Sequence, residues 1–322
     1  MNSFKSIKAR RARSAVWAAF ASVLASLAVP ARAANYDISG SITFQVPDTV
    51  VLDSYNVAGQ VMNSRQVLYD NVAPNRVWLG RAGSGADAYG LHASTYVGAN
   101  NIANGDSGGL LFRAAASVLA SFSDMVIAGP VGATSVQAPI NFHLSGQQIL
   151  GPYASDSPVF TSNVQSSVAL QVFADTHSTG GSSNFFYRNG VVSPPQQTGL
   201  LAGLGNSAHV QTPVWTLPVN TPFTLTLQMN TDVAVSVVFS DGYITSALSD
   251  FGKTLSFATD RPVFTLPAGY TVNSADAGIV NNTFSTPVPE PSPAALLAAG
   301  LAFVLWVPRL AAKAQGLRSS HS

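Results

Sequence analysis

The chain has 322 residues, no cysteine and a formal net charge of +1. The lack of cysteine excludes disulfide staples, thiol catalysis and cysteine metal sites. Six of the sixteen Lys and Arg precede Ala34 and three follow Val307, whereas all fourteen Asp lie between these positions. The middle of the chain is therefore an acidic domain of formal charge −7, which should repel nucleic acid and other anionic polymers.

The first 33 residues have the three parts of a secretory signal peptide. A basic segment with a pair of adjacent arginines is followed by the apolar run 15–29 and by a small-x-small site at Ala31 and Ala33. These features predict export, cleavage by signal peptidase and a mature chain that begins at Ala34. The arginine pair is also compatible with a twin-arginine signal, although ordinary secretion is favoured.

A period of two dominates the middle of the chain. Apolar and polar residues alternate over 36–45, 140–145, 168–172 and 223–230, which predicts strands with one face in a core and one in water. A domain nearly free of Lys and Glu but rich in Ser, Thr, Asn, Gln and Gly also favours strands over helices. We therefore predict an all-β fold over 34–286, an antiparallel β-sandwich of jelly-roll-like type.

Turn signals divide these strands. The dipeptides Asn-Gly at 189–190 and Asp-Gly at 241–242 accept the positive φ angles of two-residue hairpin turns, so we expect a hairpin at each. The Gly-, Ala- and Ser-rich stretches 80–109 and 176–183 are predicted to be loops at one rim of the sheets. The alanine-rich segment 110–121 fits a helix or a strand, and the β context slightly favours a strand.

Residues 105–109 spell Gly-Asp-Ser-Gly-Gly, the sequence around the nucleophile of trypsin-like serine proteases. That class needs a histidine and an aspartate far upstream of the serine, whereas the sole histidine before Ser107 is His92, fifteen positions away. A glycine-rich turn is the favoured interpretation. A secreted hydrolase is thus the weakest functional alternative.

No other pattern carries catalytic or metal chemistry. The five histidines lie more than five residues apart, and no stretch matches a calcium loop. An acidic domain is compatible with a single structural calcium ion, but the sequence assigns no ligands to it. We predict no catalytic residue, no metal site and no cofactor. The run Phe185-Phe186-Tyr187 puts an aromatic on each face of its strand, either as core, which is favoured, or as a sugar-stacking platform.

The C-terminus from residue 287 joins a proline-rich spacer, an apolar run at 294–307 and a basic tail. Extended to 312, the run reaches the length of a membrane span, and Arg309 can then reach the cytoplasmic headgroups. The alternative is a buried core helix. The residues of the spacer motif are Val288, Pro289, Glu290 and Pro291.

This order of segments resembles the PEP-CTERM sorting signal of exported proteins in Gram-negative bacteria that make exopolysaccharide. Residues 249–257 and 263–274 are also similar to the segment that closes the outer domain of many such proteins. The resemblance implies cleavage near the Pro-Glu-Pro motif by exosortase, an intramembrane transpeptidase. The tail departs from the family in one respect, because its basic residues are spread over ten positions instead of forming a tight arginine cluster.

We therefore expect a signal peptide at 1–33, an exported β-sandwich at 34–286 and a sorting signal with a transmembrane helix at 287–322. The precursor would be anchored in the inner membrane and the product would be extracellular or on the cell surface. The expected role is a non-catalytic structural protein of the cell surface or the exopolysaccharide (biofilm) matrix. Its expected partners are signal peptidase, exosortase and extracellular polysaccharide, with no nucleic acid. A carbohydrate-binding module is the main alternative.

Overall fold

The computed structural model describes residues 34–46, 48–59, 64–73, 76–87, 90–101, 110–151, 154–155, 161–188, 191–203, 207–238 and 243–284. All of them belong to one compact unit, which ends at Ser285. Its strands are β1 (Asn35–Val46), β2 (Asp48–Gly59), β3 (Ser64–Ala73), β4 (Arg76–Asp87), β5 (Gly90–Asn101), β6 (Leu110–Ala128), β7 (Ser135–Ala138), β8 (Asn141–Leu150), β9 (Ala154–Ser155), β10 (Thr161–Ala174), β11 (His177–Arg188), β12 (Val191–Val192), β13 (Gln196–Gly199), β14 (Ser207–Gln211), β15 (Trp215–Pro218), β16 (Phe223–Val238), β17 (Tyr243–Phe257), β18 (Thr271–Asn273), β19 (Ile279–Val280) and β20 (Thr283–Phe284).

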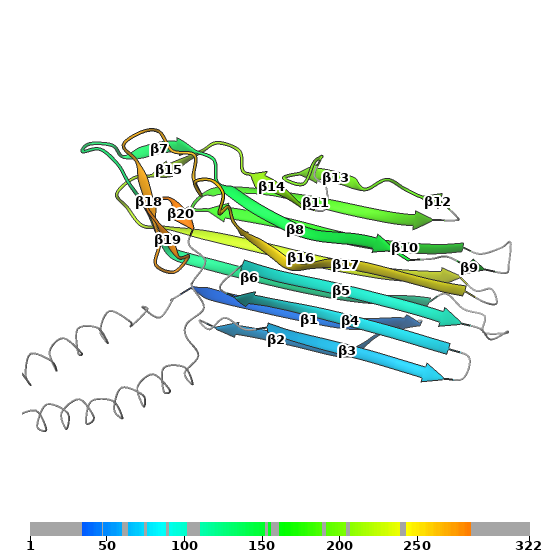
Figure 1. The fold of residues 1–322 in the computed structure, drawn as a ribbon. Helices are drawn as coiled ribbons and strands as arrows, with labels where there is room; N and C mark the ends of the chain where they lie inside the picture. Colours follow the sequence, from blue (N-terminus) through cyan, green and yellow to red (C-terminus); the bar gives the residue numbers. More distant parts are fainter. Residues whose placement is uncertain are drawn as a thin grey trace, which may run out of the picture. The chain divides into compact units, whose positions relative to one another are not determined.

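Two antiparallel sheets pack together as a sandwich (Figure 1). Sheet A has the order β12-β11-β10-β16-β6-β1-β2, with β13 added to β11 and β18 to β6. Sheet B has the order β14-β8-β17-β5-β4-β3, with β9 added to β17. The prediction of an all-β antiparallel sandwich is confirmed at this level.

Hydrophobic alternation places the core as the sequence predicts. On β16 the side chains of Phe223, Leu225, Leu227 and Met229 are buried, while the intervening polar residues face outward. The same holds for β10 and for β1 up to Thr43. On β8, Phe142 and Leu144 are buried as predicted, but the polar Asn141 is buried as well. Burial of one face of each strand supplies the main stabilisation, because each large apolar side chain contributes roughly 1.5–3 kcal/mol when fully buried.

The segment from Val263 to Phe284 closes one end of the sandwich. Strand β18 pairs with the end of β6, and β19 pairs with β20 (Figure 1). The Asp124 carboxylate accepts hydrogen bonds from the Ser274 hydroxyl, at 2.5 Å, and from the Asp276 amide, at 3.0 Å. Because Phe264 is also fully buried, this end cap is part of the domain core.

Two stretches predicted as loops are strands. Residues 80–101 lie mostly in β4 and β5, and residues 177–183 lie in β11. Neighbouring strands satisfy the backbone of these small residues on both sides, so tertiary pairing overrides their weak strand propensity. In β11 a side chain at Gly181 would lie 2.5 Å from the backbone oxygen of Thr198, so the close approach of β13 requires glycine there.

The two hairpin signals have different outcomes. At 189–190 the prediction is correct, because Tyr187 pairs with Val192 and Arg188 with Val191. At 241–242 it is wrong, because β16 pairs with β6 and β10 in sheet A while β17 pairs with β5 and β8 in sheet B. The Asp-Gly segment thus joins the two sheets. The ambiguous segment 110–121 is confirmed as a strand, the first part of β6.

Candidate functional site

Most of the site residues discussed in the sequence lie outside the described part of the chain. These are the signal-cleavage residues Ala31 and Ala33, and the Val288–Pro291 sorting motif with Arg309. The protease-like Gly-Asp-Ser-Gly-Gly segment with Ser107 also lies outside it. Ala34 is described and is buried directly before β1. Within the described ranges, no helix is long and apolar enough to span a membrane.

The two ends of the described domain meet at one small pocket. Tyr36, near the start, and Phe284, near the end, both line it, together with Phe257 of β17. The pocket is apolar and holds about 30 Å³, the size of a single water molecule. The chain therefore enters and leaves the sandwich at the same end, which is the end closed by the cap.

A shallow groove of about 430 Å³ lies on the outer face of sheet B. Strand register sets its lining, because Tyr96 of β5 stands between Arg81 of β4 and Leu248 of β17. In the next row Ser94 stands between Gly83 and Asp250. Since Gly83 and Ser94 are small, they leave the row hollow between the larger side chains. Apart from the buried Thr95, the lining side chains that carry polar or aromatic groups are Gln66, Arg81, Ser94, Tyr96 and Asp250.

The Tyr96 side chain extends along the outer face of β5 toward Gly98. A Cβ atom added to Gly98 would lie 2.4 Å from the phenol oxygen and 3.0 Å from the carbon that carries it. The phenol end of the ring therefore covers Gly98, two residues along the same outer face. Tyr96 also lines the groove. A side chain at position 98 would displace the Tyr96 ring.

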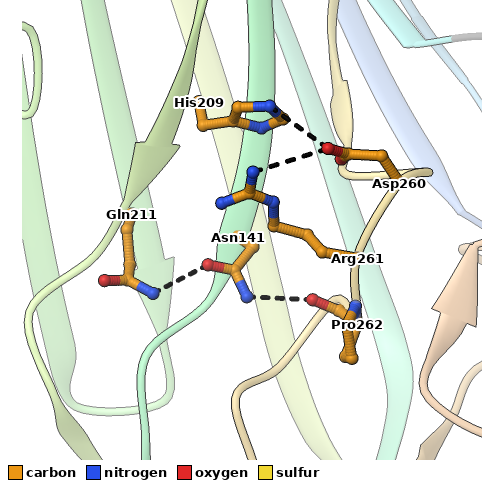
Figure 2. Close-up of polar contacts among 6 residues, drawn as sticks. All are labelled: Asn141, His209, Gln211, Asp260, Arg261 and Pro262. Carbon is orange, nitrogen blue, oxygen red and sulfur yellow. Dashed lines mark hydrogen bonds and ion pairs between the residues drawn. The ribbon is translucent and has the colours of Figure 1, made fainter.

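The chain also brings two distant histidines together. His143 on β8 and His209 on β14 pair directly across strands, with ring centroids 5.6 Å apart. His209 Nε2 lies 3.3 Å from an oxygen of Asp260, and Arg261 lies 3.4 Å from the same oxygen (Figure 2). Desolvation acts to raise the pKa of Asp260, but the hydrogen bond from Arg261 and the nearby His209 and Arg261 outweigh it and lower that pKa.

Beside this cluster, Asn141 acts as a brace. Its side-chain oxygen accepts a hydrogen bond from Gln211, and its amide donates to the Pro262 carbonyl (Figure 2). The same amide also donates to the Thr265 hydroxyl. These contacts tie β8 to β14 and to the cap. The exposed His209–Asp260 pair therefore borders a structural junction. Among the contacts of the described residues, no nucleophilic side chain is bonded to this pair.

On the outer face of sheet A, Arg113 of β6 forms an ion pair with Asp232 of β16. Desolvation raises the pKa of Asp232, and the hydrogen bond and charge of Arg113 oppose this increase without cancelling it. Serine and asparagine side chains surround the pair. This face is hollowed like the groove of sheet B but has no flat aromatic ring in its lining apart from Tyr55, whose hydroxyl is bonded to Ser84 at 2.7 Å.

Of the aromatic run at 185–187, one residue belongs to the core. Tyr187 is buried, which agrees with the favoured core interpretation. Phe185 and Phe186 are half-buried. Across the described ranges, no three acidic or histidine side chains gather to hold a metal ion.

Sequence reasoning did not find the groove of sheet B. Its residues come from four strands, and all except the buried Thr95 stand at outward positions of their strands. Alternation alone could have shown that Arg81, Tyr96 and Asp250 point to solvent. Only strand order and register bring them together, and both depend on long-range pairing.

The comparisons with known proteins add no name to this geometry. No protein-family model, no curated protein and no solved structure matches the chain.

Proposed function

We propose that the chain is an exported, non-catalytic structural protein of the cell surface or exopolysaccharide matrix. It is delivered by a cleavable signal peptide and processed by an exosortase at its PEP-CTERM tail. The observation that carries the proposal is the order of three C-terminal segments: the Val288–Pro291 motif, the apolar run and the basic tail. Each part alone is common, and the ordered set is specific.

Two features of the domain support this proposal. The segment 263–274, which resembles the closing segment of such proteins, packs as the end cap of the sandwich. The chain enters and leaves the domain at that same end. Signal cleavage before Ala34 and processing after residue 286 would therefore both occur beside one end of a finished sandwich, leaving the rest of the domain untouched.

The finer architecture belongs to the same proposal. It comprises an N-terminal signal helix, a C-terminal transmembrane helix and jelly-roll-like connectivity. In favour of the connectivity, the chain passes between the sheets from β2 to β3, from β5 to β6 and from β16 to β17. The pairs β1–β2, β4–β5 and β10–β11 instead remain within one sheet, as simple hairpins do.

Replacement of the motif glutamate tests the sorting proposal. In the producing bacterium, the Glu290→Ala variant should stay in the membrane fraction at full length, because the recognition motif is lost. The wild-type protein in the medium should lack residues 294–322 and begin at Ala34. Mass spectrometry of the terminal peptides measures both ends. Thr286→Ala, just outside the motif, is the matched control and should be processed normally.

A truncated variant that lacks residues 294–322 should skip membrane retention altogether. If wild-type protein recovered from the medium still carries the apolar run, the sorting proposal is wrong. Normal processing of Glu290→Ala would likewise exclude recognition of this motif.

A further inference from the structure

The groove on the outer face of sheet B is distinct from the sorting signal and has the chemistry of a sugar site. Two small residues, Gly83 and Ser94, form the floor of the groove and leave space between Gln66 and Asp250. The lining of the groove includes the ring of Tyr96. An aromatic ring is the kind of surface on which the apolar face of a pyranose ring packs, burying C–H groups against the aromatic.

The polar groups of the groove include both donors and acceptors of hydrogen bonds. Arg81 donates, the Asp250 carboxyl group can accept, and the Gln66 amide and Ser94 hydroxyl can do either. Adjacent hydroxyl groups of a sugar present donors and acceptors in the same alternation. A small number of such groups beside an aromatic surface is the usual make-up of a specific small-molecule or glycan site.

The charge pattern disfavours other polymers. Arg81 and Asp250 have opposite signs, and the middle of the chain carries fourteen aspartates against seven basic residues. Nucleic acid requires a cluster of positive charge. Peptide binding by strand addition uses the edge of a sheet, whereas the groove lies on its face and three of its four strands, β4, β5 and β17, are paired on both sides. A glycan needs neither feature.

The groove is also extended. A second hollow of about 440 Å³ shares Gln66 and Ser94 with the groove. It also includes Gly83 of β4 and continues past His92 toward Asp87. His92 Nε2 lies 2.9 Å from an Asp87 carboxylate oxygen at this end. Two adjoining hollows along one sheet face suit consecutive sugar units better than a single monosaccharide.

We propose that this groove binds an internal segment of an extracellular polysaccharide, with one pyranose ring stacked on Tyr96 and its hydroxyl groups bonded by Gln66, Arg81 and Asp250. The inference deepens the proposed function, because it gives a matrix protein its point of attachment to the matrix polymer. It requires no catalysis and no metal ion.

The geometry offers a variant that fills the groove without disturbing the fold. A Cβ atom added to Gly83 meets its nearest neighbour at 3.5 Å, which is ordinary contact, and the position faces outward. Gly83→Leu should therefore fold and place its side chain on the groove floor. Gly59→Leu is the matched control, because a Cβ atom there meets nothing within 4 Å and the position lies on β2, outside the groove. Tyr96→Ala removes the stacking ring.

Affinity gel electrophoresis of the full chain, purified in detergent, tests the inference. The gels contain hydroxyethyl cellulose as a neutral polymer, alginate as an anionic one, or polysaccharide extracted from the producing bacterium. We expect retardation of the wild type in at least one gel. Gly83→Leu and Tyr96→Ala should weaken the apparent affinity roughly ten-fold or more, as loss of a stacked aromatic contact predicts. Gly59→Leu should bind as the wild type does.

Several results would overturn the inference. They are wild-type binding by both groove variants, absence of retardation in every gel, or retention on single-stranded DNA or lipid vesicles in place of polysaccharide. The two proposals fail separately. Normal C-terminal processing with no polysaccharide binding removes only the groove, and polysaccharide binding without processing removes only the sorting signal.

Discussion

Asp232 and Asp260 have pKa shifts of opposite sign, so they should affect stability in opposite ways as pH falls. The raised pKa of Asp232 means that the folded state favours its protonated form. The stability that protonated Asp232 contributes is complete below the ordinary pKa of 3.8 and is lost as pH rises through the pKa of the folded state. We therefore expect the free energy of unfolding of Asp232→Asn, relative to that of the wild type, to be higher at pH 7 than at pH 3.5. Urea unfolding at the two pH values measures this difference.

Asp260→Asn provides the comparison of opposite sign. The lowered pKa of Asp260 means that its carboxylate stabilises the folded state above pH 3.8, and that this contribution is lost as pH falls through the folded pKa. The variant should thus be less stable than the wild type at pH 7, and the gap should close in acid. If the difference in free energy of unfolding between a variant and the wild type does not change with pH, the pKa shift assigned to that residue is contradicted.

Burial of single residues was largely predictable. Alternation placed Leu227 in the core and Gln228 outside it, and the structure agrees. The contacts of each residue were not predictable, since His143 and His209 are adjacent only through the pairing of β8 with β14. A pattern of period two gives the direction of a side chain and says nothing about its neighbour.

At the scale of elements, β10 and β17 cross closely enough for serines to bond between the two sheets. The Ser166 hydroxyl donates to the Leu248 carbonyl at 2.9 Å, and the Ser249 hydroxyl donates to the Ser167 carbonyl at 3.0 Å. Both serines are fully buried. The two bonds are reciprocal, so they fix the position of one strand against the other.

Removal of either hydroxyl should delete one of the two buried hydrogen bonds between the sheets. Ser166→Ala and Ser249→Ala should each lower the free energy of unfolding by about 0.5–1.5 kcal/mol. In the double variant the losses should not add, because both bonds hold the same strand crossing. Ser178→Ala, at an exposed position of β11, is the control. Losses below about 0.5 kcal/mol in both single variants, the range of ordinary surface substitutions, would show that the crossing is not braced by these bonds.

The type of most elements followed from the sequence, but their partners did not. Asn-Gly and Asp-Gly have the same turn chemistry, yet one closes a hairpin in sheet A and the other joins the two sheets. Turn residues specify a local reversal or bend of the chain. Whether the next strand pairs with the last or crosses to the opposite sheet is decided by which faces must be buried.

At the scale of the whole molecule, the domain should fold without either terminal segment. Its compact unit ends at Ser285, its last buried side chain among the described residues is Phe284, and the chain has no cysteine to oxidise. Residues 34–286, produced in the cytoplasm, should unfold cooperatively with a Tm within about 2 °C of that of the processed protein, a difference below 1 kcal/mol at this size. Thermal unfolding followed by circular dichroism measures both.

The matched comparison is a chain that ends at residue 262. It lacks the end cap and leaves the surroundings of buried Phe264, Val272 and Phe284 exposed to water. This shorter chain should aggregate or melt far below the longer one. Equal stability of the two chains would show that the cap does not belong to the core.

The sequence by itself determined the strand-rich class, the faces of the alternating strands, the acidic charge of the middle and the expected sorting signals at both ends. These depend on composition and short-range pattern, which a chain displays whatever its fold. Only the tertiary structure decided the order of strands, the end cap, and the meeting of Gln66, Arg81, Tyr96 and Asp250 in one groove. Those features depend on register between distant segments, where a shift of one residue turns every side chain to the opposite face.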